Sequence, residues 1–157
     1  MAGKVVRIVA VGRLRTPHWV EAAEYYVKRL QHWRTITIQL VKDGEASLPM
    51  IDRNTLEGQR LMAAFAPHDC VICLDERGKH MTSPEFAAFL QRLSEDANKI
   101  PCFVLGGAFG LSPAVRNTAQ HLVSLGPMTL PHELARVVLL EQIYRAEAII
   151  RRVPYHH

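Results

Sequence analysis

The chain has 157 residues, of which 48% are hydrophobic and 22% charged, and this composition is typical of one globular domain spanning residues 1–157. The formal net charge is +4 at pH 7, and no apolar run approaches the roughly 20 residues that a membrane-spanning helix requires. Residues 1–7 lack the apolar core and cleavage site of a signal peptide. We therefore expect a cytoplasmic protein with no membrane partner.

Apolar, β-branched runs alternate with segments of helical periodicity along the whole chain. The pattern predicts strands at residues 5–11, 35–41, 69–74, 102–105 and 121–125. It predicts helices at residues 17–33, 53–65, 83–98, 112–120 and 133–152, a loop at 42–52 and a charged turn at 75–79. This alternation indicates an α/β fold with a mostly parallel sheet and helices on both faces.

Positive charge is concentrated at the start of the chain, where residues 1–42 hold eight basic residues against two acids. A one-sided positive field of this kind favours a polyanion such as RNA. An ordinary solvated surface explains the same residues, so the charge alone is only a weak indication of nucleic-acid binding.

Cys70 and Cys73 have the C-x-x-C spacing of some redox and zinc sites. They lie in a predicted strand, where residues three apart point to opposite faces. No second ligand pair follows at zinc-site spacing, and Cys102 stands alone on another strand. We interpret all three as small buried apolar residues and expect no metal site.

Two loops rich in glycine or proline follow predicted strands in the last third of the chain. Residues 106–110 read G-G-x-x-G, which is not the G-x-G-x-x-G of a dinucleotide site, and no acidic residue follows the next strand to bind a ribose. Residues 126–131 are mostly apolar and expose their main chain. The two loops predict adjoining backbone-lined cradles that bind a flat heterocycle, with Met128 and Leu130 covering its faces.

The predicted helix at 133–152 has apolar residues on more than one face, whereas an amphipathic helix on a monomer shows a single apolar stripe. The extra apolar surface indicates a second burial partner. We favour a homodimer interface; the alternative is that the helix packs between elements of its own chain.

Seven motifs occur in a fixed order along the chain, at residues 9–12, 57–60, 74–75, 105–112, 128–132, 136–146 and 154–156. Together they resemble the small single-domain SPOUT-class RNA methyltransferases that modify N3 of a pseudouridine in 23S ribosomal RNA, over essentially the whole chain. The resemblance implies a C-terminal trefoil knot, S-adenosylmethionine as methyl donor, and a homodimer whose partner chain completes the active site. It also favours the assembled ribosome as substrate.

The resemblance assigns the S-adenosylmethionine site to one strand end, the glycine turn and the loop at 126–131. With both glycines of the turn included, the predicted cofactor-binding residues are Leu74, Gly106, Gly107, Gly126, Pro127, Met128, Thr129, Leu130 and Pro131.

The implied reaction is attack of a ring nitrogen on the donor's methyl group, which requires no metal and no covalent enzyme intermediate. N3 must lose a proton, so a base helps, and His156 is the first candidate, with Tyr155 orienting or stacking on the nucleobase and His132 as second candidate. Arg136 is predicted to hold phosphate or to neutralise a developing oxyanion. The alternative for residues 155–156 is a frayed tail.

Two other functions fit parts of the pattern. A nucleotide-binding oxidoreductase would explain the glycine turn, but the dinucleotide spacing and the ribose acid are missing. A non-catalytic RNA-binding module would explain the basic first third but not the two cofactor-like loops.

Overall fold

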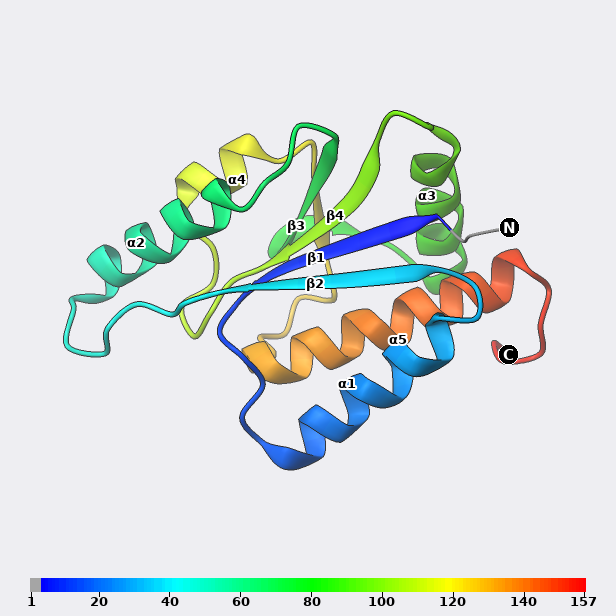
Figure 1. Cartoon of the computed structure of the whole chain (residues 1–157), viewed down its shortest axis with the longest axis horizontal. Helices are drawn as coiled ribbons and strands as arrows, with labels where there is room; N and C mark the ends of the chain where they lie inside the picture. Colours follow the sequence, from blue (N-terminus) through cyan, green and yellow to red (C-terminus); the bar gives the residue numbers. More distant parts are fainter. Residues whose placement is uncertain (1–3) are drawn as a thin grey trace.

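The computed structural model describes residues 4–157 and confirms an α/β fold around an all-parallel, five-stranded sheet (Figure 1). The strands are β1 (Val5–Val11), β2 (Thr35–Val41), β3 (Asp69–His80), β4 (Ile100–Leu105) and β5 (His121–Ser124). The helices are α1 (Pro17–Leu30), α2 (Met50–Ala63), α3 (Ser83–Glu95), α4 (Pro113–Thr118) and α5 (His132–Ile150). The sheet order is β2-β1-β4-β3-β5, with every neighbouring pair parallel. All five strands therefore end at the same edge of the sheet.

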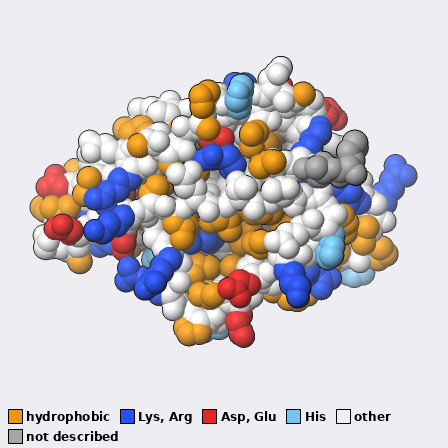
Figure 2. Space-filling model, in the orientation of Figure 1, with side chains coloured by type: hydrophobic (Ala, Val, Ile, Leu, Met, Phe, Trp, Pro, Cys, Tyr) orange, Lys and Arg blue, Asp and Glu red, His pale blue; other side chains and the backbone are white. Residues whose placement is uncertain are grey.

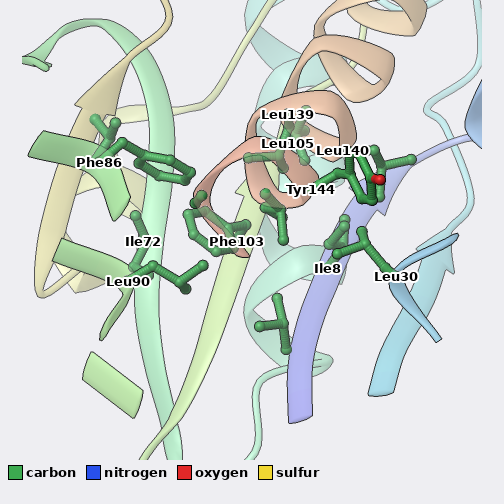
Figure 3. Packing of buried hydrophobic residues seen from close by; sticks show 14 of the residues in the cluster. Ile8, Leu30, Ile72, Phe86, Leu90, Phe103, Leu105, Leu139, Leu140 and Tyr144 are labelled. Carbon is green, nitrogen blue, oxygen red and sulfur yellow. The ribbon is translucent and has the colours of Figure 1, made fainter. Parts of the chain in front are cut away.

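The helices cover both faces of the sheet, as the apolar strands predict. Helices α1, α3 and α5 pack on the face whose core includes Ile8, Ile72 and Phe103, and Figure 3 shows Phe86 and Leu140 closing over these strands. Helices α2 and α4 cover the opposite face in a second, smaller cluster. Burial on two faces explains why β1, β4 and the first half of β3 read as nearly continuous apolar runs, whereas the edge strand β2 alternates and is mostly exposed.

Helix α5 contacts α1 on one side, α3 on the other and β4 beneath it (Figure 1). Leu139, Leu140 and Ile143 are fully buried in this arrangement. The apolar residues around α5 thus have partners within their own chain, which is the alternative that the sequence left open. A homodimer stays a prediction and no longer follows from the pattern of this helix.

Strand β3 differs most from its prediction. The sequence predicted that it ends at Leu74 before a charged turn at 75–79, but the strand continues to His80, so that prediction is wrong. Its pairing with β5 is interrupted instead, since both Leu74 and Lys79 align with Val123. Residues 75–78 bulge out of the ladder between these two points, and bulges of this kind re-aim side chains at sheet edges.

The other element boundaries differ from prediction by a few residues. Helix α2 begins at Met50, inside the predicted loop, while α1 and α3 end three residues early, at Leu30 and Glu95. The start of α3 is fixed by a capping box between Thr82 and Glu85. In the described part of the chain, no helix has the length and apolar character needed to cross a membrane.

Two of the basic residues in the first third of the chain are used inside the fold. Arg7 forms an ion pair with Asp69 at 3.4 Å, and Arg34 forms one with Glu147 at 2.5 Å. On the face shown in Figure 2, Lys and Arg side chains occur in separate groups with acidic side chains among them. The excess of basic residues in the first 42 residues therefore does not form one continuous basic surface on that face.

The Arg34–Glu147 pair joins the start of β2 to α5 in the interior. Both side chains are buried, and Arg34 also donates to Ser94 Oγ at 3.1 Å. We expect Glu147→Gln to lower the free energy of unfolding by about 3–5 kcal/mol, because Arg34 keeps its charge without a compensating carboxylate. Urea denaturation measures this. Arg151→Ala is the matched control: Arg151 pairs with the same carboxylate but is 42% exposed, so its loss costs under about 1 kcal/mol. Equal costs for the two variants would contradict the prediction.

Candidate functional site

A cavity of about 730 Å³ opens at the edge of the sheet where the strands end. Its walls come from the end of β3 and from the loops that follow β4 and β5. Of the predicted cofactor-binding residues, Leu74, Gly106, Gly107, Gly126, Met128, Thr129, Leu130 and Pro131 line it. Pro127 lies in the same loop but does not line the cavity.

The sheet order brings these loops together. Strand β3 lies between β4 and β5, so the loops that follow its two neighbours flank the end of β3 from both sides. The second loop begins with a tight turn, in which the Ser124 hydroxyl accepts from Gly126 N–H at 3.0 Å and donates to Gly126 O at 2.8 Å. Gly126 has φ +134°, a conformation that other residues rarely adopt.

The glycine turn packs closely on itself. The N–H of Gly110 donates to Gly107 O at 3.1 Å, and a Cβ on Gly106 would overlap the carbonyl group of Gly110. A Cβ on Gly107 would instead lie 3.0 Å from Glu57 Oε2 and 3.1 Å from Val11 Cγ1. Gly106 therefore allows the turn to close, while Gly107 allows it to sit against the buried side chains of α2 and β1.

The cavity has room and chemistry for a nucleoside-sized ligand. Its volume lies within the usual range of ligand sites. A Cβ placed on Gly110 or Gly126 would meet nothing within 4 Å, so both main-chain segments face open space. Met128 is 79% exposed at the rim, where an apolar side chain can cover an aromatic ring.

Charged residues of the β3 bulge also line the cavity, and sequence reasoning missed them because it placed them in a surface turn. Asp75 pairs with Arg116 at 3.7 Å. Glu76 accepts a hydrogen bond from the Thr129 hydroxyl at 2.9 Å, which ties the second loop to β3. Arg77 lines the same wall. The available signal was a charged run directly after an apolar strand, where the ends of parallel strands often carry functional residues.

His132 lines the cavity at the first residue of α5, so it keeps its place as a candidate. Arg136, one turn later, does not. It is 3% exposed, and its guanidinium donates to the carbonyl oxygens of Val11 and Gly12 at 3.2 and 2.7 Å. Burial lowers its pKa. Arg136 therefore fastens α5 to the end of β1 and does not line the cavity; a role in holding phosphate or a developing oxyanion stays a prediction.

Glu133, beside His132, fastens the same end of α5 to the segment before α1. Its carboxylate accepts from the Thr16 hydroxyl at 2.6 Å and from the backbone N–H groups of Arg15 and Thr16. The Thr16 and Arg15 hydrogen bonds lower the pKa of Glu133 to about 2. This position explains why Thr16 precedes α1 without capping it through its side chain.

The depressed pKa of Glu133 predicts a pH dependence of stability. A carboxylate with a lower pKa in the folded than in the unfolded state stabilises the fold above its unfolded pKa of about 4.3, and this contribution is lost as the pH falls towards 2. We expect the difference in urea midpoint between wild type and Glu133→Gln to be largest above pH 5 and to shrink steadily towards pH 2. A difference independent of pH would contradict this origin.

The C-terminal tail is ordered against α5, which excludes the frayed alternative for Tyr155. Its ring packs edge-on against Tyr144 with centroids 4.8 Å apart, and its hydroxyl donates to Glu141 Oε1 at 3.1 Å. Burial, followed by the charge of Glu141, raises the pKa of the Tyr155 hydroxyl, so it stays protonated. His156 follows on the surface, with Arg145 beside it.

The structure does not bring the tail and the cavity together within one chain. The cavity lies at the first residue of α5, His132, while the tail packs near Arg145, thirteen residues further along the helix. At 1.5 Å per residue, His132 and Arg145 lie about 20 Å apart along the helix, and Ala135 of the cavity lies about 9 Å along it from Glu141, which binds Tyr155. Figure 1 shows the chain terminus at the far end of α5 from the start of that helix.

Within residues 4–157, no group of three or more His, Cys, Asp or Glu side chains is placed to hold a metal ion. Cys70, Cys73 and Cys102 are free and buried, which confirms their interpretation as apolar residues. Burial raises the pKa of the Cys73 and Cys102 thiols to about 12, so neither is a reactive thiolate.

Comparison with known proteins gives a consistent result. A family model described as "Predicted SPOUT methyltransferase" matches residues 5–156. A protein of Nitratidesulfovibrio vulgaris strain DP4, called ribosomal RNA large subunit methyltransferase H, is 57% identical over 154 residues, which cover 98% of this chain and 99% of the relative. A protein of the same name from Desulfovibrio desulfuricans is 54% identical over 157 residues and all of both chains.

Solved structures agree on the fold. A probable methyltransferase from Bordetella pertussis superposes with a TM-score of 0.57 over 92% of this chain and 95% of that one, at 16% sequence identity. A probable methylase family protein from Haemophilus influenzae gives the same TM-score over all of this chain and 72% of that one, at 14% identity. At these identities the likeness concerns the arrangement of the chain and not its chemistry.

Proposed function

The chain belongs to the SPOUT methyltransferase family, and from this membership we propose that it transfers a methyl group from S-adenosylmethionine to N3 of a pseudouridine in 23S ribosomal RNA. The observation that carries the proposal is the backbone-lined cavity between the glycine turn and the loop at 126–131. Relatives called ribosomal RNA large subunit methyltransferases, at more than half identity over nearly the full chain, support the substrate class.

The residues around the cavity fit the donor. Main-chain groups of the glycine turn and of residues 126–131 hold its adenosine part, and Leu74, Met128 and Leu130 supply apolar cover. When bound, the donor supplies an electrophilic methyl group on a positively charged sulfur. Glu76, fixed by Thr129, places a carboxylate in the same cavity, which suits a ligand that carries positive charge.

Arginines beside the cavity fit an RNA substrate. A smaller hollow of about 240 Å³ adjoins the cavity and shares Gly107 and His132 with it. Arg13, Arg15 and Arg53 line this hollow together with Asp43, which pairs with Arg15 at 3.4 Å and with Arg53 at 4.0 Å. Such arginines contact phosphates and hold the RNA in register, although they carry no sequence information.

The active site is completed across a homodimer. His156 lies beside Arg145, about 20 Å along α5 from His132 at the cavity, so we assign Tyr155 and His156 to an acceptor base at the cavity of a partner protomer. In a two-fold dimer each protomer places its tail at the cavity of the other, which gives two equivalent sites. His132 contributes from the chain that binds the donor.

Three further expectations belong to this proposal. The C-terminal part of the chain forms the trefoil knot implied by family resemblance, within a single domain. The protein acts in the cytoplasm, where ribosomes are available as substrates. The assembled ribosome is the preferred substrate, since a small protein gains specificity from the shape of a large assembled surface.

The experiment that tests the proposal uses ribosomes that lack the modification. The purified protein is incubated with them and with S-adenosylmethionine labelled in its methyl group, and the ribosomal RNA is digested to nucleosides. We expect label in N3-methylpseudouridine and nowhere else. No label would identify a binding module, and tight binding of NAD in place of S-adenosylmethionine would identify an oxidoreductase.

A further inference from the structure

The guanidinium of Arg145 lies against the ring of His156, with one terminal nitrogen 3.2 Å from Nδ1. A guanidinium has five N–H donors, no acceptor, and a charge that it keeps at every physiological pH. Nδ1 is therefore the acceptor of this contact. In a neutral imidazole only one nitrogen accepts, so the proton of His156 is on Nε2.

The guanidinium is itself held in place from two sides. Its Nε and other terminal nitrogen both donate to Glu141 Oε1, at 3.0 and 2.7 Å. Its charged group also lies 4.7 Å from the centre of the Tyr155 ring, and the Tyr155 hydroxyl donates to the same carboxylate oxygen. This network leaves Arg145 little freedom to turn away, and so the tautomer of His156 is a built-in property of the tail.

The fixed tautomer suits one chemical role and opposes another. Nε2 already carries a proton and has no lone pair to offer as a base. The lone pair of Nδ1 is already engaged by the hydrogen bond from Arg145. An Nε2–H group is, however, a ready hydrogen-bond donor.

The acceptor nitrogen gives such a donor a target. N3 of a uracil ring lies between two carbonyl groups, and as its proton leaves, negative charge spreads onto both carbonyl oxygens. We propose that His156 donates a hydrogen bond from Nε2–H to one of these oxygens, and that Arg145 is the positioning residue that selects the required tautomer. This inference rests on the proposed function and replaces the general-base role first expected of His156.

The step balances without an enzyme base. The N3–H bond breaks and its proton passes to a water molecule, while the electron pair of N3 forms the bond to the incoming methyl carbon. The carbon–sulfur bond breaks and its electron pair stays on the sulfur. His156 remains neutral throughout and acts by stabilising charge where it develops, as the donors of an oxyanion hole do.

The tautomer can be measured in the protein alone. Two-bond ¹⁵N–¹H correlation spectra distinguish the two neutral forms of a histidine ring, and the signals of His156 are identified by their absence in His156→Gln. We expect the Nε2–H pattern in wild type above pH 8 and a mixture of both tautomers in Arg145→Ala. An Nδ1–H pattern in wild type, or no change in Arg145→Ala, overturns the inference.

Kinetics separate a donor from a base. Glutamine has an amide N–H donor but cannot take up a proton, whereas alanine has neither property. We expect kcat to fall about 100-fold in His156→Ala and to be at least tenfold higher in His156→Gln than in His156→Ala, with KM little changed. Equal kcat values for the two variants overturn the donor role.

His32→Ala is the matched control, because His32 is an exposed histidine just beyond α1 and is not a member of the Arg145–Glu141–Tyr155 network; its kcat should equal that of wild type. Failure of the donor role is distinguishable from failure of the proposed function. If only the donor role is wrong, the wild-type protein still methylates ribosomal RNA. If the proposed function is wrong, the wild-type protein transfers no methyl group, while the tautomer of His156 is still the Nε2–H form.

Discussion

Removal of Tyr155–His157 leaves a folded protein that binds S-adenosylmethionine normally and methylates ribosomal RNA about 1,000-fold more slowly. The donor cavity is complete without the tail, since no residue beyond Ala135 lines it. In the proposed dimer the loss falls on the acceptor base, which then lacks Tyr155 and His156 to orient and stabilise it. Isothermal titration with the donor and single-turnover methylation measure the two halves of this prediction.

The controls for the truncation address stability and length. Loss of the Tyr155 ring removes an aromatic contact with Tyr144, which is worth about 1 kcal/mol, so the melting temperature should fall only slightly. Removal of His157 alone should leave both donor binding and transfer close to wild type. A truncated chain that loses donor affinity would contradict the separation of cavity and tail.

Gly106→Val abolishes donor binding, with an expected rise in Kd of at least about 100-fold. The new Cβ would overlap the carbonyl group of Gly110, so the glycine turn must open and withdraw its main chain from the cavity. Isothermal titration measures the affinity, and circular dichroism verifies that the sheet is retained. Unchanged affinity would show that the turn does not hold the donor.

Two neighbouring variants sharpen the test of Gly106. Ala108→Ser changes an exposed residue of the same turn that also lines the cavity but already has a Cβ, so the turn stays closed and the loss of donor affinity should be far smaller than in Gly106→Val. Gly107→Val should also lose affinity, but for another reason: its side chain would press on Glu57 and Val11. Gly107→Val should therefore also unfold at a lower urea concentration than wild type, whereas Ala108→Ser should unfold at the same concentration.

The two largest effects can be combined in one mixing experiment. A tail-deleted protomer has an intact cavity, and a Gly106→Val protomer has an intact tail. If the tail serves the partner's cavity, random mixing gives about half mixed dimers with one working site of two, and recovers about a quarter of wild-type activity. No recovery would contradict the exchange of tails.

The strands and the cofactor loops were predictable because each leaves a local signal. The apolar run at β4 followed by the glycines of 106–110, and the Gly126–Pro131 loop after β5, identify strand ends directly. In a parallel sheet such ends meet at one edge, so the approximate place of the cavity followed from the sequence as well. Six further lining residues, Leu105, Ala108, Phe109, Gly110, Leu111 and Leu125, belong to or adjoin these loops. The meeting of the two loops depends on the strand order.

The remaining features depend on contacts between distant residues. The charged run at 75–79 reads as a turn. Only the alignment of both Leu74 and Lys79 with Val123 makes residues 75–78 a bulge, of which residues 75–77 line the cavity. Arg136 reads as a free cation on a helix, but the carbonyl groups that bind it come from Val11 and Gly12, over a hundred residues earlier. The separation between the C-terminal tail and the cavity of the same chain could not be predicted from the sequence either.

Helix α5 carries one half of the proposed site at its first residue and positions the other half beyond its last turns. Its 19 residues form an unbroken helix of about 28 Å, so in the proposed dimer its length sets the spacing between the donor cavity and the tail of one protomer. Insertion of one residue would advance the tail by about 1.5 Å and rotate it by about 100°. Length should therefore be invariant in this helix among active relatives, whereas the connection between β2 and α2 is free to vary.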